Sequence, residues 1–192
     1  AEVAAEVAAE GIPRENIKIA VAQNADDQAE TILFRILRGA GTDGLSGISY
    51  RRFDEYGNEI IRPLLDVSKA EILAYCTEHD LRPCIDHTNL EPIYARNKIR
   101  LNLIPYLEKE YNTNIKDTMI RMGKTASVDK DFLWRQALET FADLVKEKSE
   151  NSVLMDGAKL RRLHRAVRQR VFAKAFHSIG LTEDLAFIHF DG

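Results

Sequence analysis

The change of hydrophobic period at Asn24 restricts the fold of this chain more than any other feature of its sequence. Residues 17–22 alternate large apolar with small or polar residues and are rich in β-branched types, which predicts a strand. Beyond Asn24 the apolar residues recur every three or four positions, the spacing of one helix face. Because residues 1–10 also favour a helix, the order helix, strand, helix predicts an α/β sheet domain. The apolar positions of the second helix are Ala29, Ile32, Leu33, Ile36 and Leu37.

Three local signals organise the part of the chain that follows. A glycine-rich stretch at residues 39–47 ends the helix. The pair Gly57-Asn58 predicts a hairpin-like turn between two short extended segments. A capping box from Ser68 to Glu71 opens a helix that we expect to reach about His79.

The sequence changes in character after about Asn112. From there no convincing strand is found, and helical patterns cover residues 115–148 and 160–179. We therefore predict two domains, an α/β domain in residues 1–112 and a smaller all-helical domain in residues 113–192.

Composition excludes several classes of protein. No apolar run approaches the roughly 18 residues that a membrane span needs. The two cysteines, Cys76 and Cys84, lack the spacing of a zinc or redox site, and the five histidines form no metal-ligand pattern. We expect a cytoplasmic protein that has no membrane contact and no metal site built from cysteine or histidine. The net charge of −3 does not exclude nucleic acid, because basic residues gather in residues 161–174.

The start of the predicted second helix carries the most suggestive charges. Asn24 is a suitable N-cap, and Asp27 and Glu30 lie one turn apart on a face that Arg38 also shares, about three turns later. Carboxylates at a helix start directly after a strand occupy the crevice where open α/β sheets bind ligands, and two of them suit a cationic amine or a metal ion. The alternative is a solvated helix face whose acids favour the helix dipole.

Five sequence motifs occur in an order typical of one known family. They are residues 24–31 (NADDQAET) with Arg38-Gly39 and Gly44-Leu45, residues 61–65 (IRPLL), residues 68–72 (SKAEI), residues 86–89 (DHTN) and residues 94–100 (YARNKIR). With these motifs the chain resembles, over residues 17–107, the bacterial tRNA(Ile)-lysidine synthetase family of PP-loop ATP-pyrophosphatases. The family usually has histidine where this chain has Gln23 or Asn24.

The resemblance implies both a fold and a reaction. The fold is a doubly wound, Rossmann-like parallel-sheet PP-loop domain, of which residues 1–112 are the remainder, followed by a helical linker and tRNA-binding domain. In the reaction, ATP adenylates C2 of the wobble cytidine in the isoleucine tRNA with a CAU anticodon. The side-chain amine of free L-lysine then displaces AMP. The implied cofactors are ATP and Mg²⁺, and a homodimer is left open.

The resemblance also assigns roles to particular residues. Catalytic roles fall to Asp27, Glu30 and Arg96; substrate binding to these three with Asn97 and Arg100; ATP binding to Asn24, Arg38 and Arg62; and tRNA binding to Arg161, Arg162, Arg165 and Arg168. Two of these assignments have an equally good structural alternative. Arg62 would then be a structural residue at a strand end, and the basic helix predicted between Arg161 and Lys174 would be a solvated face.

The spacing of Arg96 and Arg100 supports an anionic ligand. The two lie one helical turn apart with the same charge, so each repels the other, and an anion between them would relieve this. A phosphate, the carboxylate of lysine and the tRNA backbone are the candidates. The alternative is that both arginines pair with surface acids such as Glu91 or Glu108.

The phosphate loop of the family, S-G-G-x-D-S, is not found in these 192 residues. We therefore expect either an N-terminally truncated part of a longer enzyme or an enzyme that has lost this loop. In both cases we expect the 192 residues alone not to cleave ATP to AMP and pyrophosphate. Two other functions stay open. A tRNA thiolase of the same superfamily is disfavoured by the isolated cysteines, and a non-catalytic RNA-binding protein would rely on the helical half.

Overall fold

The computed structural model describes residues 16–83 and 94–181, so the helix expected in residues 1–10 lies outside the described part. Contacts divide the chain into two compact units, residues 1–127 and residues 128–192. The division falls inside the long helix α7 (Ile115–Leu144), later than the boundary expected at residue 112. Among the described residues no helix is long and apolar enough to cross a membrane.

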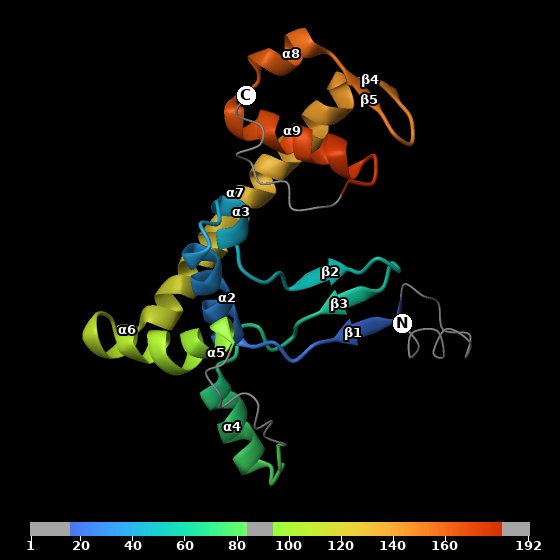
Figure 1. Cartoon of the computed structure of the whole chain (residues 1–192). Coiled ribbons are helices and arrows are strands. Elements are labelled where there is room, and N and C mark those ends of the chain that lie inside the picture. Colours follow the sequence, from blue (N-terminus) through green and yellow to red (C-terminus); the bar gives the residue numbers. More distant parts are fainter. Residues whose placement is uncertain (1–15, 84–93, 182–192) are drawn as a thin grey trace. The chain divides into compact units, whose positions relative to one another are not determined.

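The first unit contains a small sheet with helices between and after its strands (Figure 1). The strand and helix expected on either side of Asn24 are both confirmed. In chain order the elements are β1 (Lys18–Ala20), α2 (Ala25–Leu37), α3 (Thr42–Leu45), β2 (Arg51–Phe53), β3 (Glu59–Ile61), α4 (Lys69–Glu78), α5 (Ala95–Lys98), the π-helical segment η3 (Ile99–Leu103), α6 (Ile104–Glu110) and the first part of α7.

The sheet is mixed, which corrects the expected parallel arrangement. Its order is β1-β3-β2, with β1 parallel to β3 and β2 antiparallel to β3. The hairpin predicted at Gly57 is confirmed, and it is the cause: Asp54 accepts the backbone N–H groups of Tyr56 and Asn58, and Gly57 has a φ of 80°. A hairpin this tight forces its two strands to run antiparallel. The described strands therefore do not form a doubly wound parallel sheet.

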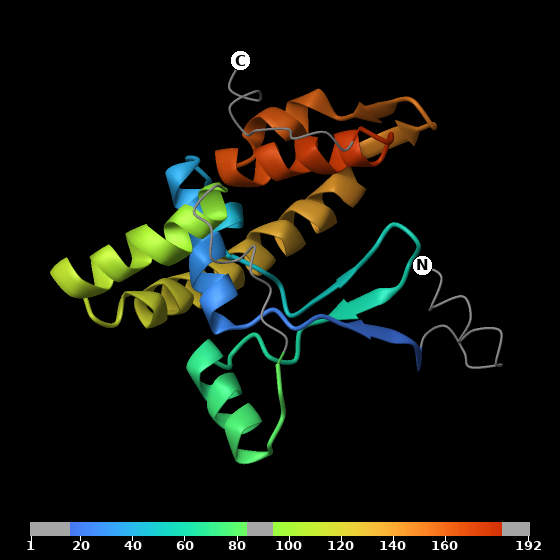
Figure 2. The ribbon, with the colours of Figure 1, turned by 60° about the horizontal axis from the view of Figure 1, so that its bottom comes forward.

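Local sequence explains where α2 and α4 begin. Asn24 accepts the N–H of Asp27, and the Asp27 carboxylate accepts the N–H of Asn24, each at 3.0 Å. Ser68 and Glu71 make the same reciprocal pair at the start of α4, as the capping box predicts. Helix α4 has no buried residue, and it projects away from the rest of the first unit in both views (Figures 1 and 2).

The core of the first unit joins α2 to η3, α6 and α7. The π-helical turn at η3 has a local cause, because Pro105 has no N–H to donate to the carbonyl group one turn earlier. The N–H of Ile104 instead bonds the carbonyl of Ile99, five residues back. The buried members of this core are Ile32, Leu33, Ile99, Ile104 and Met119.

The second unit corrects the prediction of an all-helical domain. After α7 the chain forms an antiparallel hairpin of β4 (Val145–Lys148) and β5 (Val153–Met155). The exposed Lys146, Glu147 and Lys148 suit a helix as well as a strand, so sequence alone did not separate them. Val145, Val153 and Met155 pack on a core of Ala137, Phe141, Leu144, Val171 and Ala175.

The basic stretch is not one continuous helix, contrary to expectation. Helix α8 (Gly157–Arg162) ends before Leu163, which is extended, with a ψ of 145°. Helix α9 (Arg165–His177) begins anew after His164, whose Nδ1 accepts the N–H of Ala166. The break separates the four predicted tRNA-binding arginines into two pairs.

Candidate substrate-binding site

The candidate site lies where the carboxyl end of β1 leads into α2. The capping box at Asn24 fixes the first turn of α2 and sets the position of Asp27. Glu30 follows one turn later on the same face. The two carboxylates therefore lie in the first two turns of the helix that follows β1, and a ligand-binding crevice at this position stays a prediction.

Four charged side chains meet there in one cluster, which we call the acid–arginine cluster: Asp27, Glu30, Arg96 and Arg100. Arg96 contacts Asp27 through Nη2 at 3.1 Å and Glu30 through Nε at 3.2 Å. Arg100 contacts Asp27 through Nη2 at 3.1 Å and binds Glu30 with two nitrogens, at 2.5 and 2.9 Å. Each acid therefore touches both arginines, although more than sixty residues separate them in the sequence.

The cluster is closed at its base and open at its rim. The side chain of Glu30 is 2% exposed and that of Asp27 18%, whereas those of Arg100 and Arg96 are 27% and 44% exposed. The hydrogen bond and the charge of Glu30 raise the pKa of the Arg100 guanidinium, against the opposing effect of burial. A ligand from solution would meet Arg96 and Asp27 before it met Glu30.

Among the described residues, Arg96 and Arg100 pair with the acids Asp27 and Glu30. Glu108, one of the surface acids considered as a partner, binds Lys116 at 3.3 Å. An anionic ligand between the two arginines stays a prediction. Glu91 lies outside the described residues, as does the motif at residues 86–89. Asn97, the remaining predicted substrate contact, lies half-buried in α5 between the two arginines in sequence.

The three residues predicted to bind ATP are not brought together. Asn24 acts as the N-cap of α2. Arg62 is 8% exposed, and it donates to the side chain of Gln23 and to the carbonyl oxygen of Ser49, the latter at 2.9 Å. Arg38 is the C-cap residue at the far end of α2. A phosphate-binding role for these residues stays a prediction.

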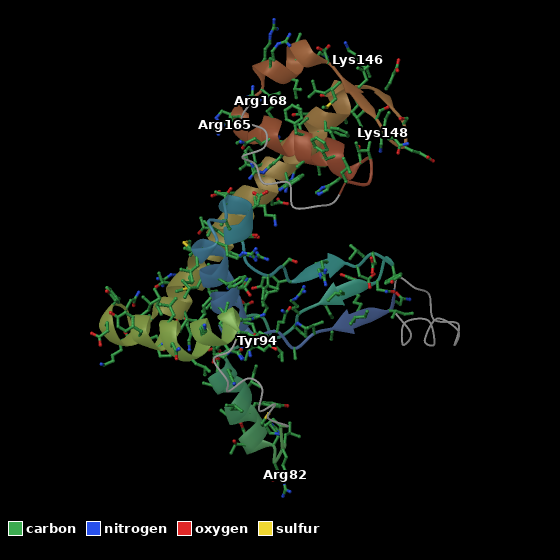
Figure 3. The ribbon with its side chains drawn as sticks, viewed as in Figure 1. Arg82, Tyr94, Lys146, Lys148, Arg165 and Arg168 are labelled. Carbon is green, nitrogen blue, oxygen red and sulfur yellow. The ribbon has the colours of Figure 1, made fainter. Side chains whose placement is uncertain are left out.

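The predicted tRNA-binding arginines lie in the second unit. Arg161 and Arg162 are exposed in the last turn of α8, and Arg165 and Arg168 are in the first turn of α9. Figure 3 shows the latter two side chains near the start of α9, while Lys146 and Lys148 project from the β4–β5 hairpin. The positive charges of this unit thus come from separate elements, and their role stays a prediction.

Sequence reasoning missed a second ion-pair network beside the cluster. Asp26 accepts the backbone N–H of Lys69 at 2.7 Å and binds Lys116 at 3.1 Å. Burial raises the pKa of Asp26, but the Lys69 N–H and the Lys116 ammonium together lower it below its ordinary value. No local signal marks these partners, because they are far apart in sequence.

The described residues do not fit a metal site. No group of three or more His, Cys, Asp or Glu side chains in the described part of the chain lies close enough to hold a metal ion. Asp27 and Glu30 already have cationic partners. The Mg²⁺ implied by the resemblance therefore stays a prediction, and no chemical step is assigned to it.

Residues 7–107 match the family described as the PP-loop domain, which is more than half of the chain. The chain therefore belongs to the PP-loop domain family, with mixed α/β content in this part and a mainly helical C-terminal region.

Curated relatives give a more specific likeness. The chain is 42% identical over 168 residues to a tRNA(Ile)-lysidine synthase of Clostridioides difficile, a match that covers 86% of this chain and 35% of the relative. It is 40% identical over 162 residues to the protein of that name from Clostridium tetani, covering 84% and 33%. The resemblance indicated by the motifs is confirmed. The chain spans about a third of the length of these curated relatives.

Proposed function

We propose that this chain is part of an ATP-dependent ligase that joins lysine to C2 of the wobble cytidine in the CAU-anticodon isoleucine tRNA. Membership of the PP-loop family supports the use of ATP. The name shared by the curated relatives supports the tRNA product. The acid–arginine cluster is the observation that carries the proposal, because its chemistry matches an amino acid substrate.

The cluster offers both kinds of charge that a lysine molecule needs in a binding site. Two carboxylates and two guanidinium groups lie side by side in it. A lysine molecule carries two ammonium groups and one carboxylate. Asp27 would take the side-chain ammonium through a charge-assisted hydrogen bond, and the exposed Arg96 would take the carboxylate.

The side-chain ammonium group of lysine must lose a proton before its nitrogen can attack C2. In the proposed reaction ATP adenylates the cytidine at C2 with release of pyrophosphate. The lysine side-chain nitrogen then forms a bond to C2 as the bond to AMP breaks. In this scheme Asp27 and Glu30 hold the amine, and a carboxylate of the pair accepts the proton that the amine loses. Arg100 binds Glu30 through two nitrogens and so keeps the Glu30 carboxylate in place.

Ligand analogues test the proposal. We expect isothermal titration of the chain to detect L-lysine, with much weaker binding of norleucine, which lacks the side-chain ammonium. Cadaverine, which lacks the carboxylate, should also bind more weakly because Arg96 loses its partner. Equal binding of lysine and norleucine would contradict the proposal.

A further inference from the structure

The carboxylates of the acid–arginine cluster already have protein partners at every oxygen. In Asp27, Oδ2 accepts the backbone N–H of Asn24, and Oδ1 accepts the Nη2 groups of both Arg96 and Arg100. In Glu30, Oε1 accepts Nε of Arg100, and Oε2 accepts Nε of Arg96 and Nη2 of Arg100. Since Oδ1 of Asp27 and Oε2 of Glu30 each accept two hydrogen bonds, an ammonium group that binds there has to displace an arginine.

Arg96 is the arginine that leaves with the smaller loss. It makes one contact with each acid, at 3.1 and 3.2 Å, and its side chain is 44% exposed. Arg100 binds Glu30 through two nitrogens, at 2.5 and 2.9 Å, and its side chain is 27% exposed. The more exposed guanidinium regains water when it turns outward, whereas the two-nitrogen contact keeps Arg100 on Glu30.

The backbone that carries the two arginines supports the same order. Arg100 lies in η3 beside Ile99, which is 4% exposed and belongs to the core of the first unit. Arg96 lies in α5, a helix of four residues, none of them buried, within the described residues 94–181. The N-cap of α5, Tyr94, makes no capping hydrogen bond through its side chain in this described part. Arg96 is therefore on the more weakly held part of the segment.

We propose that Arg96 is a specificity-determining residue that makes the cluster reject diamines. While Arg96 contacts Asp27, it occupies the place of an incoming ammonium group. A ligand that carries both an ammonium group and a carboxylate offsets the exchange, because the ammonium binds Asp27 and the carboxylate binds Arg96. A diamine displaces Arg96 and offers it no acceptor, beside Arg100, which has the same charge.

Lysine and cadaverine differ in the one group that this exchange requires. Both carry two ammonium groups on the same carbon chain, and only lysine carries a carboxylate. Asp27 and Glu30 by themselves would favour cadaverine, because it has the higher positive charge. Arg96 reverses this order. The inference rests on the proposed function in taking lysine as the ligand, and it adds the class of molecules that the site excludes.

Titration of two variants with both ligands tests the inference on the whole chain. Arg96→Met keeps an unbranched side chain and removes the charge. We expect it to bind cadaverine about tenfold more tightly than the unsubstituted chain does, and lysine about tenfold more weakly. A merely structural role of Arg96 would not move the two affinities in opposite directions. Arg135→Met is the control, because this exposed arginine of α7 pairs with Asp131, and it should change neither affinity.

A second measurement needs no substitution. Acetate supplies the carboxylate that cadaverine lacks, so it gives the displaced Arg96 an acceptor. We expect the unsubstituted chain to bind cadaverine about fivefold or more tightly in sodium acetate than in sodium chloride at the same ionic strength. In Arg96→Met the two salts should give the same affinity. Should Arg96→Met fail to fold, the comparison of the two salts decides alone.

Either of two results would overturn the inference. One is a cadaverine affinity that does not rise in folded Arg96→Met, and the other is an equal affinity of the unsubstituted chain for cadaverine in acetate and in chloride. If lysine still binds the unsubstituted chain, only the inference falls and the proposed function stands. If lysine does not bind but cadaverine binds Arg96→Met more tightly, the exclusion of diamines stands and the proposed substrate is wrong.

Discussion

Glu30 is the residue on which the acid–arginine cluster depends most. Its carboxylate is almost fully buried and accepts hydrogen bonds from both Arg96 and Arg100. A charged carboxylate in such a position requires cationic partners, because burying an unpaired charge strongly destabilises the folded state. The cluster is thus a structural feature of the fold as well as a candidate site.

Replacing Glu30 tests the structural part. Glu30→Gln keeps the shape but removes the charge, so we expect the free energy of unfolding to fall by about 1–3 kcal/mol. Asp131→Asn is the control, because Asp131 and its partner Arg135 are both well exposed and the loss there should stay below about 1 kcal/mol. Urea unfolding measures both. Equal losses would show that the cluster contributes no more than a surface pair.

The neighbouring Asp26 gives a pH-dependent prediction. Because its pKa is lowered in the folded chain, its stabilising effect is complete above the ordinary value of 3.8 and is lost as the pH falls below it. Asp26→Asn should therefore reduce the loss of stability on acidification in this range, as measured by unfolding at a series of pH values. An unchanged pH dependence in the variant would contradict the assignment.

At the scale of elements, sequence predicts starts and turns better than pairings. The caps of α2 and α4 and the turn at Gly57 depend on side chains within four residues, and these were predicted correctly. The antiparallel direction of β2 was not predicted, although the turn that causes it was. The β4–β5 hairpin was missed because its exposed charged residues suit a helix as well as a strand. The hydrogen bond from Arg62 to Gln23 was not predicted either, because the two partners are distant in sequence.

The contact of α7 with α2 depends on the absence of a side chain at Gly123. A Cβ atom there would lie 2.6 Å from Cδ1 of Ile32 and 3.2 Å from the carbonyl oxygen of Leu45. Gly123→Ala should therefore destabilise the chain by about 1–3 kcal/mol, although alanine favours a helix. Gly157→Ala in α8 is the control, because its nearest contact would be an ordinary 3.7 Å. A thermal shift that is the same in both variants would contradict this packing.

At the scale of the whole molecule, the two units have separate cores. The buried cluster around Ile32 and the buried cluster around Leu144 share no residue. The sequence predicted an α/β part and an all-helical part, but it did not indicate that one helix would contribute to both units. Helix α7 contributes to both units because it is long and no local stop signal interrupts it.

Separate cores predict separate responses to substitution. Ile32→Ala and Leu144→Ala each remove a side chain that is at most 2% exposed, and each should cost about 2–5 kcal/mol. Hydrogen exchange should show faster exchange mainly in residues 16–127 for Ile32→Ala and mainly in residues 128–181 for Leu144→Ala. Equal acceleration throughout the chain in both variants would show one cooperative unit.

The most direct test of the account compares two adjacent aspartates in their binding of L-lysine. Asp27 belongs to the acid–arginine cluster, and Asp26 belongs to the neighbouring network with Lys116. By isothermal titration, Asp27→Asn should weaken lysine binding by about tenfold or more, since a charge-assisted hydrogen bond is lost. Asp26→Asn should leave the affinity unchanged. Equal effects of the two substitutions, or no lysine binding by the unsubstituted chain, would contradict the account.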